Sequence, residues 1–448
     1  MAYNGGGTDV AALVDDRVAD GVFRIDRNLY LDEDIYRREM EVIFEQGWVF
    51  LCHESQVAGA GDYFATFIGR QPVFVNRRED GTLGGFINAC SHRGAILTPF
   101  RQGNAKIFTC RFHGWAYDGA GRCIRIKNQE AGFPDPAFDR ACFNLTAVPR
   151  LESYRGFVFG CLDADAGALA DHLGDARVFM DFFTDQSPDG LEVLPGSQTY
   201  VCDHNWKLQV ENVVDGYHVS TVHRNFMTTV LNREAREGYQ GMDITETGRM
   251  TGNVANGCYD LGRGHSVIWA ERASPEAAPL YPASREVEAR CGAVRAEWML
   301  RRGRNLCVFP NVVLNDLAST HLRTHRPLGA GRCEVTIWCI APVGEPGAAR
   351  AARLRKFEDF FLVTGMATSD DVISLDLAHA GCFGRRVQWT EFGRGMSTII
   401  QGPDEDAKKL GIHPVSSNTS WDLETPYHGL YRHWRDLLTG AATAAAAE

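Results

Sequence analysis

Two Cys/His motifs close together in the first third of the chain constrain its fold more than any other feature. Residues 90–115 read CSHRGAILTPFRQGNAKIFTCRFHGW, which contains a C-x-H motif followed by a C-x-x-H motif. Short β-like runs surround the motifs, and the pairs Asp80-Gly81 and Asp118-Gly119 are turn signals between such runs. The pattern predicts a small β domain that carries both motifs on loops at the ends of strands.

Two thiols and two imidazoles form a four-ligand site, for which two metal groups compete. Structural zinc accepts two Cys and two His in a tetrahedron, whereas a Rieske [2Fe–2S] cluster takes two Cys on one iron and two His on the other. Zinc sites of this composition usually keep the two Cys together and the two His together, but here each loop carries one of each. The segments CSHRGA and CRFHGW therefore resemble the Rieske motif. The expected cluster ligands are Cys90, His92, Cys110 and His113.

Length and composition exclude several classes of protein. A chain of 448 residues is long enough for two domains. Its formal net charge of −11, with no basic block, argues against a nucleic-acid partner. No apolar run approaches the roughly 20 residues of a membrane helix. The start of the chain does not look like a signal peptide, so the 13 cysteines predict a reducing, cytoplasmic compartment.

The distribution of helical and strand-like segments along the sequence predicts an α+β protein. We expect an N-terminal helical segment over residues 1–47 that packs on the catalytic domain, and an all-β Rieske domain over residues 48–163. Residues 164–440 mix helical and strand-like runs and predict a larger catalytic domain, with an antiparallel sheet covered by helices. The alanine-rich residues 441–448 predict a disordered tail.

A second group of metal-binding residue types lies in the segment NWKLQVENVVDGYHVSTVH, which contains Asp215, His218 and His223. The two histidines are five residues apart, about 140° around a regular helix. They reach one metal only if the helix is distorted or ends between them; otherwise they are an ordinary core pair. Two histidines plus a carboxylate form the facial triad of non-haem Fe(II) oxygenases.

The carboxylate of such a triad has to come from elsewhere in the chain. Asp370 and Asp371 stand at the start of an apparent helix. Their alternative role is structural, because Thr368 or Ser369 would cap this helix and acidic residues are favourable in a first turn.

Together the motifs resemble the large (α) subunit of Rieske non-haem iron aromatic-ring-hydroxylating oxygenases, over nearly the whole chain. The resemblance implies that His218, His223 and Asp371 bind a mononuclear iron and that Asn212 lies close to it. It also implies that Asp215 bridges His218 and a Rieske histidine, His113, of a neighbouring subunit.

The resemblance also implies partners. These oxygenases are usually α trimers, commonly α3β3 hexamers with a small β subunit. The chain has no G-x-G-x-x-G after a strand, so NADH oxidation falls to a separate reductase or ferredoxin.

Within the family, the sequence is most similar to the benzoate, anthranilate and halobenzoate dioxygenase branch, which implies cis-dihydroxylation of an aromatic carboxylic acid by O2. Val213, Val214 and Arg224 depart from that branch. Val213 and Val214 are expected to line or back the pocket, and Arg224 either pairs with the substrate carboxylate or is solvated. A larger aryl acid, such as an aryloxyacetic or indole-acetic acid, is therefore an alternative substrate. A Rieske monooxygenase or demethylase and a zinc-dependent hydrolase are alternative functions.

Overall fold

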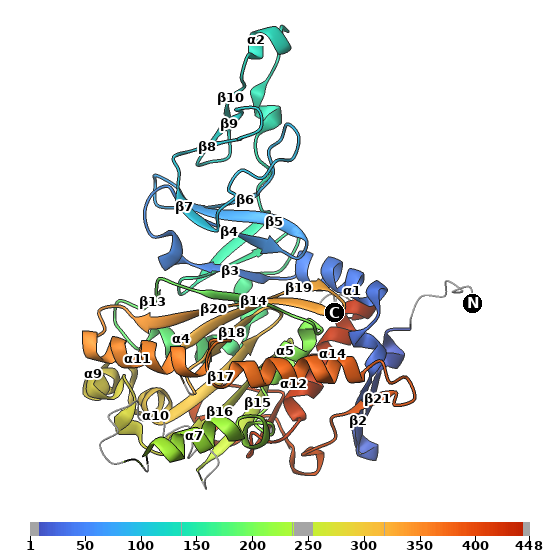
Figure 1. Cartoon of the computed structure of the whole chain (residues 1–448), viewed down its shortest axis with the longest axis vertical. Coiled ribbons are helices and arrows are strands. Elements are labelled where there is room, and N and C mark those ends of the chain that lie inside the picture. The colour runs from blue at the N-terminus through green and yellow to red at the C-terminus, as the bar shows by residue number, and fades with distance from the viewer. Residues whose placement is uncertain (1–8, 136, 235, 237–253, 318, 442–448) are drawn as a thin grey trace. The chain divides into compact units, whose positions relative to one another are not determined.

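The computed structural model describes residues 9–441, except residues 136, 235, 237–253 and 318 (Figure 1). The chain forms two compact units. One comprises Met40–Leu169, and the other combines the residues up to Glu39 with those from Ala170 onward. The sequence had suggested boundaries after residues 47 and 163. Among the described residues, no helix combines the length and apolar character needed to span a bilayer.

Most of the regular structure in the unit of residues 40–169 consists of short antiparallel strands, which are joined by loops. One sheet contains β3 (Val49–His53), β11 (Arg150–Tyr154) and β12 (Phe157–Cys161). A second contains β4 (Asp62–Ile68), β5 (Gln71–Arg77), β6 (Leu83–Ile87) and β7 (Gln102–Asn104). The third contains β8 (Ile107–Thr109), β9 (Ala116–Asp118) and β10 (Cys123–Arg125). The expected turn at Asp80-Gly81 is confirmed, because it joins the paired strands β5 and β6 with Gly81 at φ +83°.

The N-terminal segment is less helical than the sequence suggested. Its strands β1 (Val14–Arg17) and β2 (Val22–Asp26) form a hairpin, and β2 also pairs with β21 (Trp389–Glu391). The hairpin turns at Gly21, whose φ of +74° suits glycine. The expected helix follows as α1 (Glu33–Glu39), which continues into a π-helical stretch over Met40–Glu45.

The larger unit is organised around a ten-stranded antiparallel sheet. Along it the strands follow the order β13-β20-β19-β18-β17-β16-β15-β23-β22, and β14 also pairs with β20. The strands are β13 (Leu191–Val193), β14 (Gln198–Cys202), β15 (Asn256–Gly262), β16 (His265–Glu271), β17 (Arg302–Val308), β18 (Val312–Asn315), β19 (His321–Gly329), β20 (Arg332–Pro342), β22 (Ile400–Gln401) and β23 (Ser416–Asn418).

Helices pack against this sheet, in agreement with the predicted α+β fold class (Figure 1). The described helices are α3 (Leu169–Leu173), α4 (Ala176–Thr184), α5 (Trp206–Val213), α6 (Val219–Val222), α7 (Arg224–Glu234), α9 (Ser284–Cys291), α10 (Ala293–Arg301), α11 (Gly347–Phe360), α12 (Thr368–Gly381), α13 (Glu405–Leu410) and α14 (Thr425–Thr439). Helix α1 was described above, and helix α2 (Gln129–Gly132) belongs to the smaller unit.

A buried ion pair fixes helix α5, whose C-terminal end leads into the histidine segment. Lys207 lies 2.5 Å from Glu39, and both side chains are buried. The indole N–H groups of Trp206 and Trp434 also donate to the Glu39 carboxylate, at 2.8 and 2.7 Å. Because a buried charge is tolerated only when it is paired and hydrogen-bonded, this network holds α1, α5 and α14 in one arrangement.

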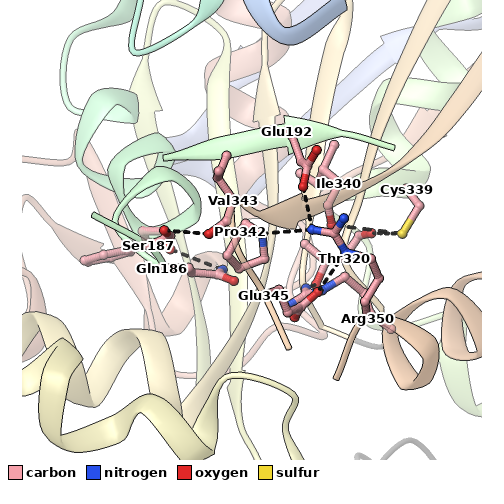
Figure 2. Close-up of polar contacts among 12 residues, drawn as sticks. Gln186, Ser187, Glu192, Thr320, Cys339, Ile340, Pro342, Val343, Glu345 and Arg350 are labelled. Carbon is pink, nitrogen blue, oxygen red and sulfur yellow. Dashed lines mark hydrogen bonds and ion pairs between the residues drawn. The ribbon is translucent and has the colours of Figure 1, made fainter. Parts of the chain in front are cut away.

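A second polar network holds helix α11 against the edge of the sheet (Figure 2). The Arg350 guanidinium donates to Glu192 of β13 at 2.5 Å and to the Pro342 carbonyl of β20 at 3.3 Å. The Ser187 hydroxyl donates to the Val343 carbonyl at 2.8 Å. These contacts matter for the site, because Phe360 and Phe361 at the end of α11 face a cavity.

Candidate metal centres

The two Cys/His loops have the same backbone conformation. In each loop the cysteine N–H donates to the carbonyl five residues later, and the glycine four residues after the cysteine donates to the cysteine carbonyl, at 2.7–2.9 Å. These glycines, Gly94 and Gly114, have φ of +70° and +74°, a region that L side chains rarely adopt. The glycine that follows each C-x-H or C-x-x-H motif is therefore part of the loop's construction.

The predicted cluster ligands lie in two like pairs, with the Cys110 side chain in contact with Cys90 and His92 beside His113. Cys90 and Cys110 are buried, and the Cys90 Sγ lies 3.2 Å from the Tyr117 hydroxyl. His92 and His113 are partly exposed, with ring centroids 4.5 Å apart. A Rieske cluster binds two thiolates on one iron and two imidazoles on the other. The buried cysteine pair and the partly exposed histidine pair fit this arrangement.

The helix break that the histidine spacing required is present. Helix α5 ends at Val213; His218 directly precedes the four-residue helix α6 and His223 directly follows it. The two imidazole rings lie edge to face, with centroids 5.2 Å apart. Because the chain does not continue as one regular helix, both rings point to the same place.

Asp215 and Gly216 shape the turn that ends at His218. The Asp215 carboxylate accepts hydrogen bonds from the N–H groups of Tyr217, at 2.7 Å, and His218, at 3.2 Å. Gly216 donates to the Trp421 carbonyl at 3.1 Å, and a Cβ at Gly216 would lie 2.6 Å from the Trp421 ring and 2.7 Å from that carbonyl oxygen. Only glycine fits this close approach.

Replacing Gly216 by alanine is therefore expected to displace the turn, destabilise the protein by about 1–3 kcal/mol and lower its iron content. Iron per chain and Tm measure both effects. Gly347→Ala is the matched control, because a Cβ there meets nothing within 4 Å. Equal iron content and Tm in the two variants would contradict this account of the turn.

The three predicted iron ligands converge on one point. The Nε2 atoms of His218 and His223 lie 3.4 and 3.3 Å from the same Asp371 carboxylate oxygen. All three ligand atoms lie within 4.8 Å of one another. The Asn212 amide donates to that Asp371 oxygen at 3.3 Å, which places Asn212 beside the three ligands.

Asp371 lies in the first turn of α12, and that turn differs from the capped helix start considered as an alternative. The hydroxyls of Thr368 and Ser369 donate to the carbonyls of Phe361 and Gly365, so neither one caps the helix. Helix α12 is instead anchored by Asp376, whose carboxylate lies 2.6 Å from the buried His204 ring. Sequence reasoning missed this contact, because nothing in the sequence shows that residues 172 positions apart meet.

The electrostatics of the site suit a cation. Burial by itself lowers the pKa of His218, but the carboxylates of Asp215 and Asp371 outweigh it and raise that pKa to about 10. Burial likewise raises the pKa of Asp371, and the two histidines more than reverse this effect. Burial lowers the pKa of His223, which keeps that imidazole neutral, the form in which histidine binds a metal. Two histidines beside an ionised carboxylate form a favourable ligand set for a divalent metal ion.

A cavity adjoins the three ligands. Its empty volume is about 630 Å³, part of it open to solvent, which is a usual size for a small-molecule pocket. Besides the ligands, its lining includes Asn212, Asp215, Val219, Phe226, Met227, Ile268, Asn305, Asn315, Leu317, Arg323, Phe360 and Phe361.

Val213, Val214 and Arg224 are not among the described residues that line this cavity. Val213 and Val214 are buried in the protein interior. Arg224 is exposed and borders a separate, open surface depression with Asp370 and Ile373. Of the two roles considered for Arg224, the structure therefore favours the solvated one.

Comparisons with known proteins identify the family. Residues 47–153 match the Rieske [2Fe-2S] domain, and residues 194–440 match the ring hydroxylating alpha subunit catalytic domain. The chain is 42% identical over 434 residues to toluate 1,2-dioxygenase subunit alpha from Pseudomonas putida, covering 96% of this chain and 94% of the relative. It is 39% identical over 420 residues to the 2-halobenzoate 1,2-dioxygenase large subunit from Burkholderia cepacia, covering 93% and 90%.

A solved structure of naphthalene 1,2-dioxygenase with bound indole has a TM-score of 0.80 and 25% identity, covering 93% of this chain and 92% of its own. The chain therefore belongs to the ring-hydroxylating dioxygenase alpha subunits, which are Rieske-type oxidoreductases. Membership of this family implies a Rieske [2Fe–2S] cluster and a mononuclear iron, and it argues against the zinc interpretation of both sites.

Proposed function

We propose that this chain is the terminal oxygenase subunit that cis-dihydroxylates an aromatic carboxylic acid, using O2 and electrons that come from NADH through a separate reductase or ferredoxin. The observation that carries the proposal is the cavity, where the partly buried His218–His223–Asp371 group faces a space lined by both polar and apolar side chains. Relatives named for toluate and 2-halobenzoate, at 42% and 39% identity, support an aromatic acid as the substrate.

In this proposal the two metal groups are held by the residues that the sequence singled out. Cys90, Cys110, His92 and His113 hold the Rieske cluster, and His218, His223 and Asp371 hold the iron. When bound, the iron would supply the activation of O2. Two histidines and one carboxylate leave coordination positions open for O2. The protein holds the aromatic ring beside it, against Phe226, Phe360 and Ile268.

Asp215 connects the two metal sites across a subunit boundary in the α3 core of an α3β3 assembly. Its Oδ2 atom lies 3.3 Å from the His218 Nδ1 atom, while its side chain is 29% exposed. One carboxylate can therefore orient the iron ligand from its own chain and also accept a hydrogen bond from His113 of the partner subunit. Such a carboxylate fixes the orientation of imidazoles at both metal sites.

The test uses iron-loaded protein, purified with any small subunit that accompanies it and supplied with a reductase and NADH. About three irons per chain are expected, two in the cluster and one in the mononuclear site. Benzoate, 2-chlorobenzoate, anthranilate, phenoxyacetate and indole-3-acetate are offered under ¹⁸O2, and the products are analysed by mass spectrometry.

A product of benzoate with two labelled oxygen atoms confirms a dioxygenase of simple aromatic acids. A single labelled oxygen in the product would show a monooxygenase instead. Turnover restricted to phenoxyacetate or indole-3-acetate would shift the substrate to a larger aryl acid. Consumption of none of these acids would contradict the proposed function.

A further inference from the structure

Arg323 is a buried cation in the wall of the iron-site cavity. It lies on β19, and its side chain lines the same cavity as His218, His223 and Asp371. Only 6% of the residue is accessible to solvent. An arginine at this position brings a permanent positive charge into a cavity that also has an apolar part of its wall, with Phe226, Ile268 and Phe360.

Arg323 differs from the other deeply buried arginines in making no ion pair within the described residues, although its charge contributes to the lowered pKa of Asp371. Each of three others has a carboxylate of this chain beside its guanidinium, in the pairs Arg302–Asp406, Arg304–Asp316 and Arg353–Glu345. Within the described part of the chain, the Arg323 side chain makes no ion pair and no hydrogen bond, and its buried Nε atom has no acceptor. Because buried charges are normally paired, the arrangement is complete only when an anion is bound.

No carboxylate that borders the cavity is free to serve as that anion. Asp371 is engaged by His218, His223 and Asn212. Asp215 accepts hydrogen bonds from the backbone of the histidine turn. When iron is bound, the carboxylate of Asp371 coordinates the metal. The positive charge of Arg323 then remains available to pair with an anionic ligand.

The surroundings of Arg323 define what that ligand looks like. Asn305 of β17 and Asn315 of β18 are direct cross-strand partners that also line the cavity. The Asn305 Oδ1 atom has no hydrogen-bond partner among the residues that the structure describes. Most of the remaining wall is apolar, with Phe226, Met227 and Ile268 among its residues. A suitable ligand combines one anionic group with a flat apolar body.

We propose that Arg323 binds the carboxylate of the aromatic acid and thereby selects acids over neutral rings. This inference rests on the proposed function and adds the residue that determines its substrate class. The planar guanidinium offers paired N–H donors that match a carboxylate, and such charge-assisted contacts are stronger than neutral ones. Arg224, the candidate suggested by the sequence, is exposed outside the cavity.

The experiment compares iron-loaded wild type with Arg323→Gln and Arg323→Lys. The matched control is Arg326→Gln on the same strand, where the arginine pairs with Glu334 and does not line the cavity. Binding of benzoate and of nitrobenzene, a neutral molecule of nearly the same shape, is measured by calorimetry and by ligand-induced shifts in Tm. Iron content and the Rieske spectrum show whether each variant has folded and loaded its metals.

We expect Arg323→Gln to raise the Kd for benzoate by roughly 30- to 100-fold, the usual loss for a charge-assisted hydrogen-bonded pair, and to leave nitrobenzene binding unchanged. Arg323→Lys should retain part of the affinity for the acid, because lysine keeps the positive charge but lacks the paired N–H donors of the guanidinium. Without ligand, Arg323→Gln should have a Tm at least as high as wild type, since it removes an unpaired buried charge.

Two results would overturn the assignment, and they differ in what else they affect. If wild type and Arg323→Gln bind benzoate equally well, or if both ligands lose affinity by the same factor, Arg323 does not select the acid, while the proposed function stands. If wild type binds nitrobenzene but no aromatic acid, the proposed function fails together with the inference.

Discussion

Replacing Asp371 by alanine is expected to abolish product formation and to release the mononuclear iron while the Rieske cluster stays intact. Asp371 is the only one of the three converging ligands that carries a negative charge, and both histidines lie within 3.4 Å of its carboxylate. Loss of a residue that merely orients a metal ligand already costs about 10- to 100-fold. Loss of the ligand itself should lower turnover by roughly 1000-fold or more.

The chain offers a close control for this variant. Asp370 is the neighbouring member of the same Asp-Asp pair, but it borders the outer depression and does not line the cavity. Asp370→Ala should keep its iron and most of its activity. Iron content, the reduced Rieske EPR signal and product yield are measured on both variants. Full iron occupancy in Asp371→Ala, or equal losses in the two variants, would remove Asp371 from the iron site.

Replacing Asp215 by asparagine is expected to leave both metals bound and to lower coupled turnover by roughly 100-fold or more. The asparagine oxygen can still accept the hydrogen bonds from Tyr217 and His218, so the histidine turn should keep its shape. What the variant loses is the negative charge that lies 3.3 Å from the His218 ring. That charge orients the iron ligand and, in the proposed assembly, links it to the cluster of the next subunit.

Single-turnover measurements locate the defect in Asp215→Asn. Reduction of the Rieske cluster by the reductase should proceed at the wild-type rate, whereas oxidation of the reduced cluster in the presence of substrate and O2 should be slow. Asp203→Asn serves as the control, because Asp203 is exposed and does not line the cavity. Cluster oxidation at the wild-type rate in Asp215→Asn would refute the bridging role.

Local sequence patterns were enough to predict the fold class and some individual turns. Hairpin chemistry at Asp80-Gly81 depends on residues that are adjacent in the chain, and the structure confirms it. The spacing of His218 and His223 predicted that the helix must break if both are to bind one metal. Helix α5 does end before them. The N-terminal hairpin was missed, since β2 is stabilised partly by β21, more than 360 residues away in the chain.

The sequence by itself determined which chemistry this protein can carry, because the Cys/His motifs and the D-G-Y-H segment are local and their ligand types are specific. The tertiary structure alone decided what surrounds that chemistry. It showed that Gly216 is required by the approach of Trp421, and that Arg323 lies in the cavity wall while Arg224 lies outside it. Whether a charged side chain is buried, and whether it has a partner among the described residues, depends on which strands lie side by side in the sheet. No local sequence pattern predicts this.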